Sequence, residues 1–356
     1  MMLCRKWFLF IPVLIVAFAG CKSIGPKTVP VDRFNYNTAI SDSWKEQTLL
    51  NIVKLRYADM PLFVEVASIV SGYTLETSVD VSGSFRSSDS ILGNAAGVGA
   101  GGRFTDRPTI TYSPLTGRKF NQNFMTPVPP RALLFLIQSG WPADLILNLT
   151  VDSINGMRSR SHGGGTPREG DPEFYEVVDL LRKLQVAGII GMRLEVNKEA
   201  DETIIIVFHR KNLIHEEQAL MTRLQELLGI DSSAEELAVH YGALAQSPNE
   251  IAILSRSMLQ IMIELAVSID VPQEHIDKKY IMPSQDPGEF KRALGIKVAL
   301  EEPEDSFAAV YYMDHWFWIE HSDFESKRTF SFIMLLFSLT ETGGTDGLPV
   351  VTIPAG

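Results

Sequence analysis

Cysteine is the residue that this chain has least of. Only Cys4 and Cys21 occur among 356 residues, and both lie at the very start of the sequence. The chain beyond Cys21 therefore has no thiol, which excludes disulfides, cysteine nucleophiles and thiolate metal sites there. Its stability must come from packing, and a composition with 45% hydrophobic and 21% charged residues supplies enough apolar side chains for a sizeable core.

Basic residues are outnumbered as well. The chain has 32 Lys and Arg against 43 Asp and Glu, which gives a formal net charge of −11, and it shows no local basic patch. A protein of this charge repels the phosphate backbone of nucleic acids. We therefore expect no nucleic-acid partner.

Sequence motifs of several enzyme classes are missing. The chain has neither a GxSxG nucleophile elbow nor a Ser-x-x-Lys pair. The segment His162-Gly163-Gly164-Gly165 matches the oxyanion segment of some lipases, but without an elbow it is better explained as part of a flexible linker. The stretch 97–102 fits GxGxxG, yet extended residues follow it where a dinucleotide site needs a helix.

Metal motifs are missing too. His209 and His215, like His315 and His321, are six residues apart, a spacing unlike that of HExxH zinc sites. Paired carboxylates such as Glu216-Glu217 are typical of solvated faces in an acidic protein. We therefore predict no catalytic residue, no metal site and no cofactor, and we expect that the protein is not an enzyme.

The first 21 residues have the pattern of an export signal. Arg5-Lys6 precede an almost wholly apolar run, 7–18, and the small residues Ala19-Gly20 lead to Cys21. The run is too short to cross a bilayer, which takes about 20 apolar residues. The ending resembles the lipobox of bacterial lipoproteins, and this resemblance implies cleavage before Cys21 and acylation of that cysteine, which anchors a protein to a membrane. The alternative is a plain secretory signal with an incidental cysteine.

The residue after Cys21 indicates whether a lipoprotein stays in the inner membrane or reaches the outer membrane. In lipoproteins generally, an aspartate at this place implies retention in the inner membrane, whereas this chain has Lys22. By the same resemblance we expect an outer-membrane lipoprotein whose body faces the periplasm.

Glycine and proline suggest how the chain is divided. They interrupt residues 21–40, and residues 159–172 combine Gly163, Gly164, Gly165 and Gly170 with two prolines and no apolar side chain. The predicted organisation is a signal peptide (1–20), a tether (21–40), an N-terminal α+β domain (41–158) with a hairpin at 73–113, a linker (159–172), a C-terminal α/β domain (173–340) and a tail (341–356).

Hydrophobic periodicity predicts the elements. Ser43 and Glu46 have the spacing of a capping box, and apolar residues at helical spacing follow, so a helix is expected from about Ser43 to Pro61. Ser322 and Glu325 repeat that spacing before a helix that runs to about residue 339. Residues 145–151 fit a buried strand or a short helix equally well. Further helices are expected at 131–139, 173–187, 213–228 and 255–266, and strands at 192–196, 203–209, 295–300, 307–312 and 316–319. Together these predict an α+β fold whose C-terminal half is an α/β sandwich of helix–strand–strand units.

The clearest strand pattern lies at 73–86. Odd positions there are apolar, small or threonine and even positions are polar or charged, which predicts one dry and one wet face. After a turn-like stretch, 87–94, a glycine-rich extended segment runs from 95 to 113. The two segments predict one long β-hairpin.

The hairpin suggests contact with a membrane or with other subunits. Its length, alternation and terminal aromatics fit strands that one subunit donates to an oligomeric pore. Asp106 and Pro108 fall on the same face as Phe104, which argues for the alternative, a periplasmic arm or a soluble sheet. The candidate contact residues are Tyr73, Val79, Val81, Phe85, Phe104 and Tyr112.

An aromatic cluster lies at 311–318. Trp316 and Trp318 could line a ligand groove, for instance by stacking on sugar rings. The alternative is that the strands bury one aromatic face on the following helix. We favour the core interpretation, because that helix supplies the apolar residues Phe330, Phe332, Ile333 and Leu336.

Three segments carry a resemblance to a protein family. The stretch 44–57 (WKEQTLLNIVKLRY), the stretch 107–117 (RPTITYSPLTG) and Trp316–Ile319 followed by Ser326-Lys327 resemble segments of a family of uncharacterised bacterial envelope lipoproteins. The similarity covers most of the chain after Cys21. It implies an envelope lipoprotein, and it transfers neither an activity nor a catalytic residue.

The anchor, the hairpin and the missing catalytic set together favour one function. We expect a membrane-anchored periplasmic lipoprotein that acts as a structural or assembly component of a cell-envelope complex, with its hairpin as a possible pore element. Its expected partners are the membrane, through the lipid, and an envelope protein or further copies of itself. The alternative is a periplasmic carbohydrate-binding protein or hydrolase that uses the C-terminal aromatic cluster.

Overall fold

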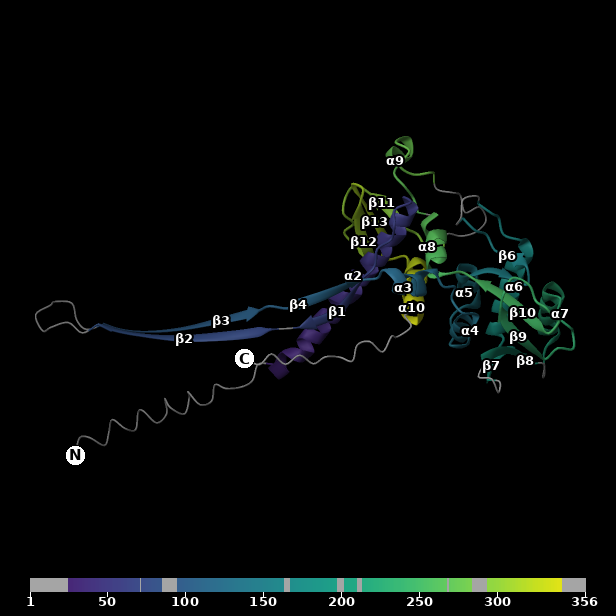
Figure 1. Ribbon diagram of the computed structural model, residues 1–356, viewed down its shortest axis with the longest axis horizontal. Coiled ribbons are helices and arrows are strands. Elements are labelled where there is room, and N and C mark those ends of the chain that lie inside the picture. The colour runs from purple at the N-terminus through teal and green to yellow at the C-terminus, as the bar shows by residue number, and fades with distance from the viewer. Residues whose placement is uncertain are drawn as a thin grey trace, which may run out of the picture. The chain divides into compact units, whose positions relative to one another are not determined.

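The computed structural model describes residues 25–70, 72–84, 95–162, 167–196, 202–209, 213–267, 269–283 and 293–340 (Figure 1). The predicted signal peptide, Cys21, the predicted turn at 87–94 and the predicted tail lie outside these residues. Helices and strands are both abundant, and the described strands form four sheets. The predicted α+β class is therefore confirmed.

Two compact units share the chain. The first comprises residues 1–44, 64–113 and 351–356, and the second comprises 45–63 and 114–350. The second unit runs without a division through residues 159–172. The expected boundary between domains therefore does not coincide with a boundary between these units.

The first unit contains two ladders formed by the same two stretches of chain. Each ladder is a two-stranded sheet, and β1 pairs with β4 while β2 pairs with β3. The bounds are β1 (Val64–Val70), β2 (Tyr73–Ser84), β3 (Ala95–Asp106) and β4 (Thr109–Pro114). β2 and β3 are antiparallel over their whole length, with Tyr73 opposite Asp106 at one end and Ser84 opposite Ala95 at the other.

Helix α2 (Gly25–Arg56) is much longer than the sequence predicts. Ser43 lies inside it and does not cap its start, and most of the expected tether is helical. Pro30 lies in the second turn, where it removes only one intrahelical hydrogen bond close to the helix end. The predicted apolar face is correct, since three side chains of the last turns are fully buried: Leu49, Ile52 and Val53.

The second unit contains a six-stranded mixed sheet in the order β6-β5-β10-β9-β8-β7. Its strands are β5 (Val151–Ile154), β6 (Met157–Arg158), β7 (Ile190–Val196), β8 (Glu202–Phe208), β9 (Glu236–Tyr241) and β10 (Glu250–Ser255). β9 and β10 are parallel although only residues 242–249 join them. All other neighbours in the sheet are antiparallel.

Helices of the second unit lie beside this sheet (Figure 1). They are α4 (Pro130–Gln138), α5 (Ala143–Thr150), α6 (Pro172–Val186) and α7 (His215–Leu228), while α8 (Met258–Val267) packs next to α5. The ambiguous segment 145–151 is therefore mostly helical. Two short helices, α3 (Gly117–Phe120) and η2 (Asn121–Met125), precede α4.

A three-stranded sheet in the order β11-β13-β12 completes the second unit. It consists of β11 (Lys297–Ala299), β12 (Ser306–Tyr312) and β13 (His315–Glu320), preceded by α9 (Gln273–Asp277) and followed by α10 (Phe324–Thr340). The cap of α10 differs from the prediction, because Asp323 accepts a hydrogen bond from the amide of Ser326 (3.1 Å), one residue later than the expected Ser322.

The expected linker is held in place by a buried cation. The guanidinium of Arg256 is almost fully buried and donates to the carbonyls of Asn148 (3.2 Å) and Leu149 (3.0 Å). It also donates to the hydroxyl of Ser159 (2.6 Å) and to the carbonyl of Arg160. A buried guanidinium needs this degree of hydrogen bonding to offset its lost hydration. The start of the segment 159–172 is therefore part of the folded body.

Glu264 holds the next residues of the same segment. Its carboxylate accepts hydrogen bonds from the amide of His162 (2.6 Å), from the His162 ring Nδ1 (2.9 Å) and from the hydroxyl of Ser161 (3.2 Å). Burial alone would raise the pKa of Glu264, but the His162 hydrogen bonds and the charge of Arg256 together lower it to about 2. His162 is thus an anchor of this segment, while Gly163 to Gly165 lie outside the described residues.

Among the described residues, no helix combines the length and the apolar character needed to cross a membrane.

The depressed pKa of Glu264 predicts a stability loss in acid. Its pKa is lower in the folded than in the unfolded chain, so its contribution is complete above about pH 4.5 and disappears as the pH falls towards 2. We expect Glu264→Gln to lower the free energy of unfolding at pH 7 by on the order of 3 kcal/mol, and we expect this difference to shrink steadily below pH 4.5. Urea unfolding of both proteins from pH 7 to pH 3 measures it.

The matched control is Glu226→Gln, which removes an exposed carboxylate from α7. Equal effects of the two substitutions, or a difference between wild type and Glu264→Gln that does not depend on pH, would contradict the assignment.

Candidate functional site

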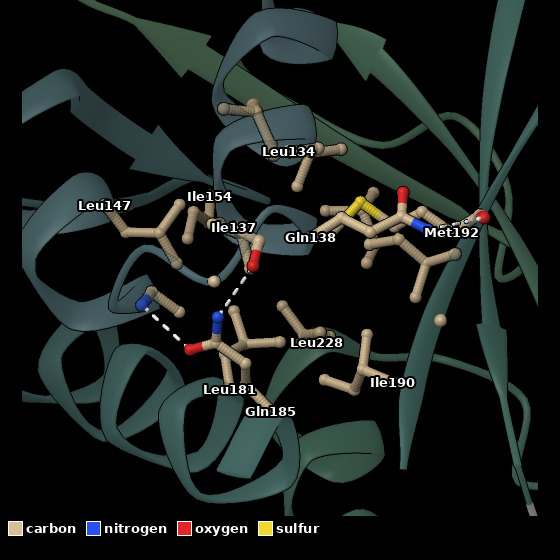
Figure 2. Close-up of a pocket in the computed structure, with 16 residues that line it drawn as sticks. Leu134, Ile137, Gln138, Leu147, Ile154, Leu181, Gln185, Ile190, Met192 and Leu228 are labelled. Carbon is tan, nitrogen blue, oxygen red and sulfur yellow. Dashed lines mark hydrogen bonds between the residues drawn. The ribbon is translucent and has the colours of Figure 1, made fainter. Parts of the chain in front are cut away.

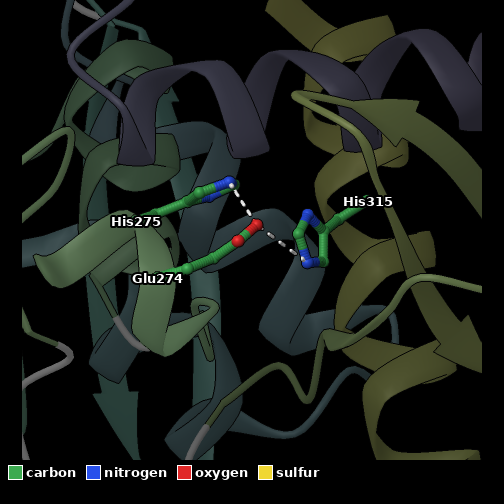
Figure 3. Close-up of side chains that lie close together, drawn as sticks. All are labelled: Glu274, His275 and His315. Atoms are coloured by element: carbon green, nitrogen blue, oxygen red, sulfur yellow. Dashed lines mark ion pairs between the residues drawn. The ribbon is translucent and has the colours of Figure 1, made fainter. Parts of the chain in front are cut away.

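Three side chains with metal-binding groups meet in the second unit. Glu274 and His275 are neighbours on α9, and His315 is the first residue of β13 (Figure 3). Each residue contributes one potential ligand atom, and these three atoms all lie within 4.8 Å of one another. We call Glu274, His275 and His315 the His–Glu cluster.

Local structure positions each member. Pro272 stands at the N-cap of α9, whose first turn carries Glu274 and His275. On the other side, the two-residue loop Met313-Asp314 joins β12 to β13 with positive φ values of 46° and 63°. Positive φ at both positions is the geometry of a tight hairpin turn, although neither residue is a glycine. The turn places His315 at the exact start of β13, on the buried side of the strand.

The cluster has a buried and an exposed part. His275 is 3% exposed and His315 is 6% exposed, whereas about half of the Glu274 side chain is exposed. Glu274 Oε1 lies 3.6 Å from His275 Nε2 and 3.8 Å from His315 Nε2. Its other carboxylate oxygen, Oε2, lies 3.6 Å from Nζ of Lys278. The two imidazole nitrogens thus face one carboxylate oxygen that solvent can reach.

The second nitrogen of each ring has its own partner. His315 Nδ1 lies 3.2 Å from the carbonyl oxygen of Met313, and His275 Nδ1 lies 2.8 Å from the hydroxyl of Tyr57. A carbonyl can only accept, so His315 Nδ1 is the donor in this contact and Nε2 is the ring nitrogen that faces Glu274. Tyr57 can accept from His275 in the same way.

Burial favours the uncharged forms of His275, Tyr57 and Tyr312. It lowers the pKa of His275, and the neighbouring His315 lowers it further, so the imidazole is neutral at pH 7. Burial likewise raises the pKa of Tyr57 to about 12. Tyr312, which donates to Asp59 (3.0 Å), has its pKa raised to about 12 by burial and by that carboxylate.

Trp316 and Trp318 lie on the opposite face of β13 from His315. The strand alternates strictly, with His315, Phe317 and Ile319 buried and Trp316, Trp318 and Glu320 partly exposed. Phe317 is therefore the aromatic residue that enters the core, and the two indoles do not. The buried aromatic face of the strand is thus that of Phe317, and the period of two in a strand places Trp316 and Trp318 on the other face.

The outer face of the three-stranded sheet forms a shallow aromatic surface. Trp316 stands between Ala299 and Tyr311, with the Tyr311 and Trp316 rings 5.5 Å apart, and Trp318 has Ala309 as one of its cross-strand neighbours. The other cross-strand neighbour of Trp318 is Lys297, and both indoles are partly exposed. We call Tyr311, Trp316 and Trp318 the aromatic surface.

The hairpin residues named from the sequence are only partly described. Phe85 lies outside the described residues, as do the side chains of Tyr73, Val79, Val81 and Phe104, while Tyr112 is exposed. The described side chains of the predicted wet face are exposed and stand opposite one another in register: Glu76 with Arg103, Ser78 with Gly101 and Asp80 with Gly99.

A partly open, mainly apolar cavity lies between the helices and the six-stranded sheet (Figure 2). Its volume is about 270 Å³, and its walls come from α4, α5, α6, the end of α7 and the strands, including Leu147, Ile154, Ile190 and Leu228. A second hollow of about 330 Å³ shares Met192 with it. The lining side chains of the first cavity carry no titratable group, so it can hold an apolar group but supplies no acid or base.

Two glutamines line the cavity, and Gln185 has partners for its amide within the protein. Gln185 donates to the carbonyls of Ile137 and Trp141 (both 2.8 Å) and accepts from the amide of Ala143 (3.0 Å), as the dashed lines of Figure 2 show in part. Gln185 therefore ties α6 to the ends of α4 and α5. Its amide is a structural group rather than a ligand contact.

The sequence did not indicate the His–Glu cluster. The spacing of histidines relates His315 only to His321, which is exposed, and Glu274 and His275 belong to no recognisable spacing. His209 and His215, the other pair considered, are both exposed. The members come together because a turn and a short helix bring residues some forty positions apart to one place, which no local pattern encodes.

Comparison of the chain with protein-family models, with curated proteins and with solved structures finds no match.

Proposed function

We propose that the chain is an outer-membrane lipoprotein, anchored through Cys21, that acts from the periplasmic side as a non-enzymatic structural component of a cell-envelope complex. The paired strands β2 and β3 are the element by which copies of the chain associate, and a pore built from these strands is the sharper form of the proposal. The observation that carries it is the two-stranded ladder of the first unit.

The ladder has the features of an incomplete sheet. Within the described residues, β2 and β3 pair only with each other, over twelve opposed positions. Both outer edges of such a ribbon present unpaired amides and carbonyls, and a two-stranded ribbon is marginally stable by itself. Strands of twelve residues are roughly 40 Å long, so the open edges are extensive.

Glycine in β3 strengthens this argument. Gly97, Gly99, Gly101 and Gly102 lie within the strand, and each glycine in a strand interior weakens it by roughly 0.5–1 kcal/mol relative to alanine. Glycines also allow another backbone to approach closely. Docking of a further strand would satisfy the open edges and offset this weakness, which supports association through the ladder.

The membrane attachment rests on the N-terminal sequence. The basic start, the short apolar run and the small residues before Cys21 support an acylated cysteine. Two or more acyl chains hold a protein on a bilayer stably, since each buried methylene contributes about 0.8 kcal/mol. The body of the protein then needs no membrane-spanning helix.

The association is tested by two neighbouring substitutions in β2. Val79 belongs to the apolar set of alternating positions and Ser78 to the exposed polar set. We expect the full-length chain in mild detergent to form an oligomer, Val79→Asp to dissociate it because a carboxylate cannot be buried between ladders, and Ser78→Asp to leave it intact. Light scattering after size-exclusion chromatography measures the mass.

A monomeric wild-type chain, or equal behaviour of the two variants, would refute association through the ladder. Circular dichroism of each variant controls for the fold of the second unit.

The anchor is tested with the only two cysteines. Cys21→Ser should abolish incorporation of labelled palmitate and release the chain from the membrane pellet, while Cys4→Ser, within the signal peptide, should leave both unchanged. Labelling and fractionation of cells that produce each variant measure this. If Cys21→Ser remained in the pellet as the wild type does, an anchor at Cys21 would be ruled out.

A second candidate function is carbohydrate binding at the aromatic surface. The observation that favours it is the partial exposure of Trp316 and Trp318 on the outer face of the three-stranded sheet, beside the exposed Tyr311. Flat, partly exposed indole rings suit stacking against the apolar face of a sugar ring. This candidate is compatible with a place in the envelope.

The aromatic surface is tested by titration with a soluble N-acetylglucosamine oligomer. Saturable quenching of tryptophan fluorescence is expected for the wild type, and Trp318→Ala should weaken it at least tenfold, because stacking area is lost. Trp141→Phe, a change beside Phe332 in the core, is the matched control. Absence of saturable quenching in the wild type would remove this candidate.

A further inference from the structure

We infer that the His–Glu cluster is a binding site for a divalent transition-metal ion of the Zn²⁺ type, held by Glu274 Oε1 and by Nε2 of His275 and His315. This inference goes beyond the proposed envelope role and is independent of it. It is argued from spacing, from ring orientation and from the chemistry of the donors.

The spacing suits a shared ion better than direct hydrogen bonds. Glu274 Oε1 lies 3.6 and 3.8 Å from the two Nε2 atoms, which is beyond the 2.7–3.2 Å range of an N–H···O hydrogen bond. Bonds of about 2.0–2.2 Å to zinc in a tetrahedral site place two ligand atoms roughly 3.4 Å apart. Small rotations of the side chains bring the three atoms to that separation.

The orientation of the rings is that of metal ligands. A ligating histidine generally donates its other ring N–H to a carbonyl, carboxylate or similar acceptor, which fixes the ring and leaves the ligating nitrogen unprotonated. His315 does so to the Met313 carbonyl, and His275 has the Tyr57 hydroxyl at 2.8 Å. Both imidazoles are buried, and their rings meet edge to face at 4.9 Å. The two imidazoles thus point the same atom, Nε2, at one carboxylate oxygen.

The donor set decides the class of ion. Imidazole nitrogen with one carboxylate favours Zn²⁺ and its neighbours among the transition metals, whereas Ca²⁺ and Mg²⁺ prefer sites made of oxygen. Three protein ligands leave one tetrahedral position for water, as in catalytic rather than structural zinc sites. The partly exposed Glu274 lies on the solvent side, so an ion and its water can enter there. Lys278, which faces the other carboxylate oxygen, remains outside the ligand set.

Calorimetric titration with Zn²⁺ alone tests the inference. The full-length chain, freed of any histidine tag and of metal by a chelator, should bind one Zn²⁺. Glu274→Gln, His275→Gln and His315→Gln should each weaken that binding at least tenfold, and Tyr57→Phe should weaken it about tenfold because an outer partner of a ligand is lost. The matched control is the double variant His240→Gln/His321→Gln, which removes two exposed imidazoles and should bind as the wild type does.

A second readout separates ligation from folding. Co²⁺ bound to the wild type should show intense visible bands of a four- or five-coordinate site, and Glu274→Gln should lose them while its circular dichroism is unchanged. About half of the Glu274 side chain is exposed, so the amide of the Glu274→Gln side chain should be tolerated there. This variant therefore tests the inference even where a histidine variant fails to fold. Wild-type binding no tighter than that of Glu274→Gln, or weakened binding in the control variant alone, would overturn the inference.

Discussion

The alternation of side chains along β13 is the constraint on which both candidate sites of the second unit depend. A strand turns successive residues to opposite faces, so the burial of Phe317 and Ile319 obliges His315 to face inward and Trp316 and Trp318 to face outward. The same register therefore supplies one imidazole to the His–Glu cluster and two indoles to the aromatic surface. A shift of one residue would exchange these roles and remove both sites at once.

Periodic segments of the fold could be predicted from the sequence, and elements held by distant contacts could not. The apolar face of α2 at Leu49, Ile52 and Val53 was visible because it repeats at helical spacing. The contacts that hold Ser159 and His162 could not be predicted, because their partners, Arg256 and Glu264, lie some hundred positions later in the chain. Parallel pairing of β9 and β10 is equally hidden, since parallel neighbours ordinarily need a crossover of a dozen or more residues.

The candidate sites also divide into residues that a local sequence pattern indicates and residues that only distant contacts bring together. The aromatic cluster that contains Trp316 and Trp318 can be identified from the sequence, but the register that buries Phe317 and leaves the two indoles partly exposed cannot. The His–Glu cluster could not be identified from the sequence. Glu274 and His275 approach His315 only in the folded chain, where α9 lies next to the Met313-Asp314 turn. The alternating pattern at 73–106 predicts the paired strands of a β-hairpin. The function of this hairpin depends on binding partners, which the sequence of one chain does not reveal.

Oxidative footprinting by hydroxyl radicals tests the register of β13 most directly. Mass spectrometry of the labelled full-length chain reports the modification of Trp316, Phe317 and Trp318 separately. The account predicts that both tryptophans are modified readily and that Phe317 between them is protected. Modification of Phe317 as fast as that of its neighbours would contradict the alternation, and with it the placement of His315 beside Glu274 and His275.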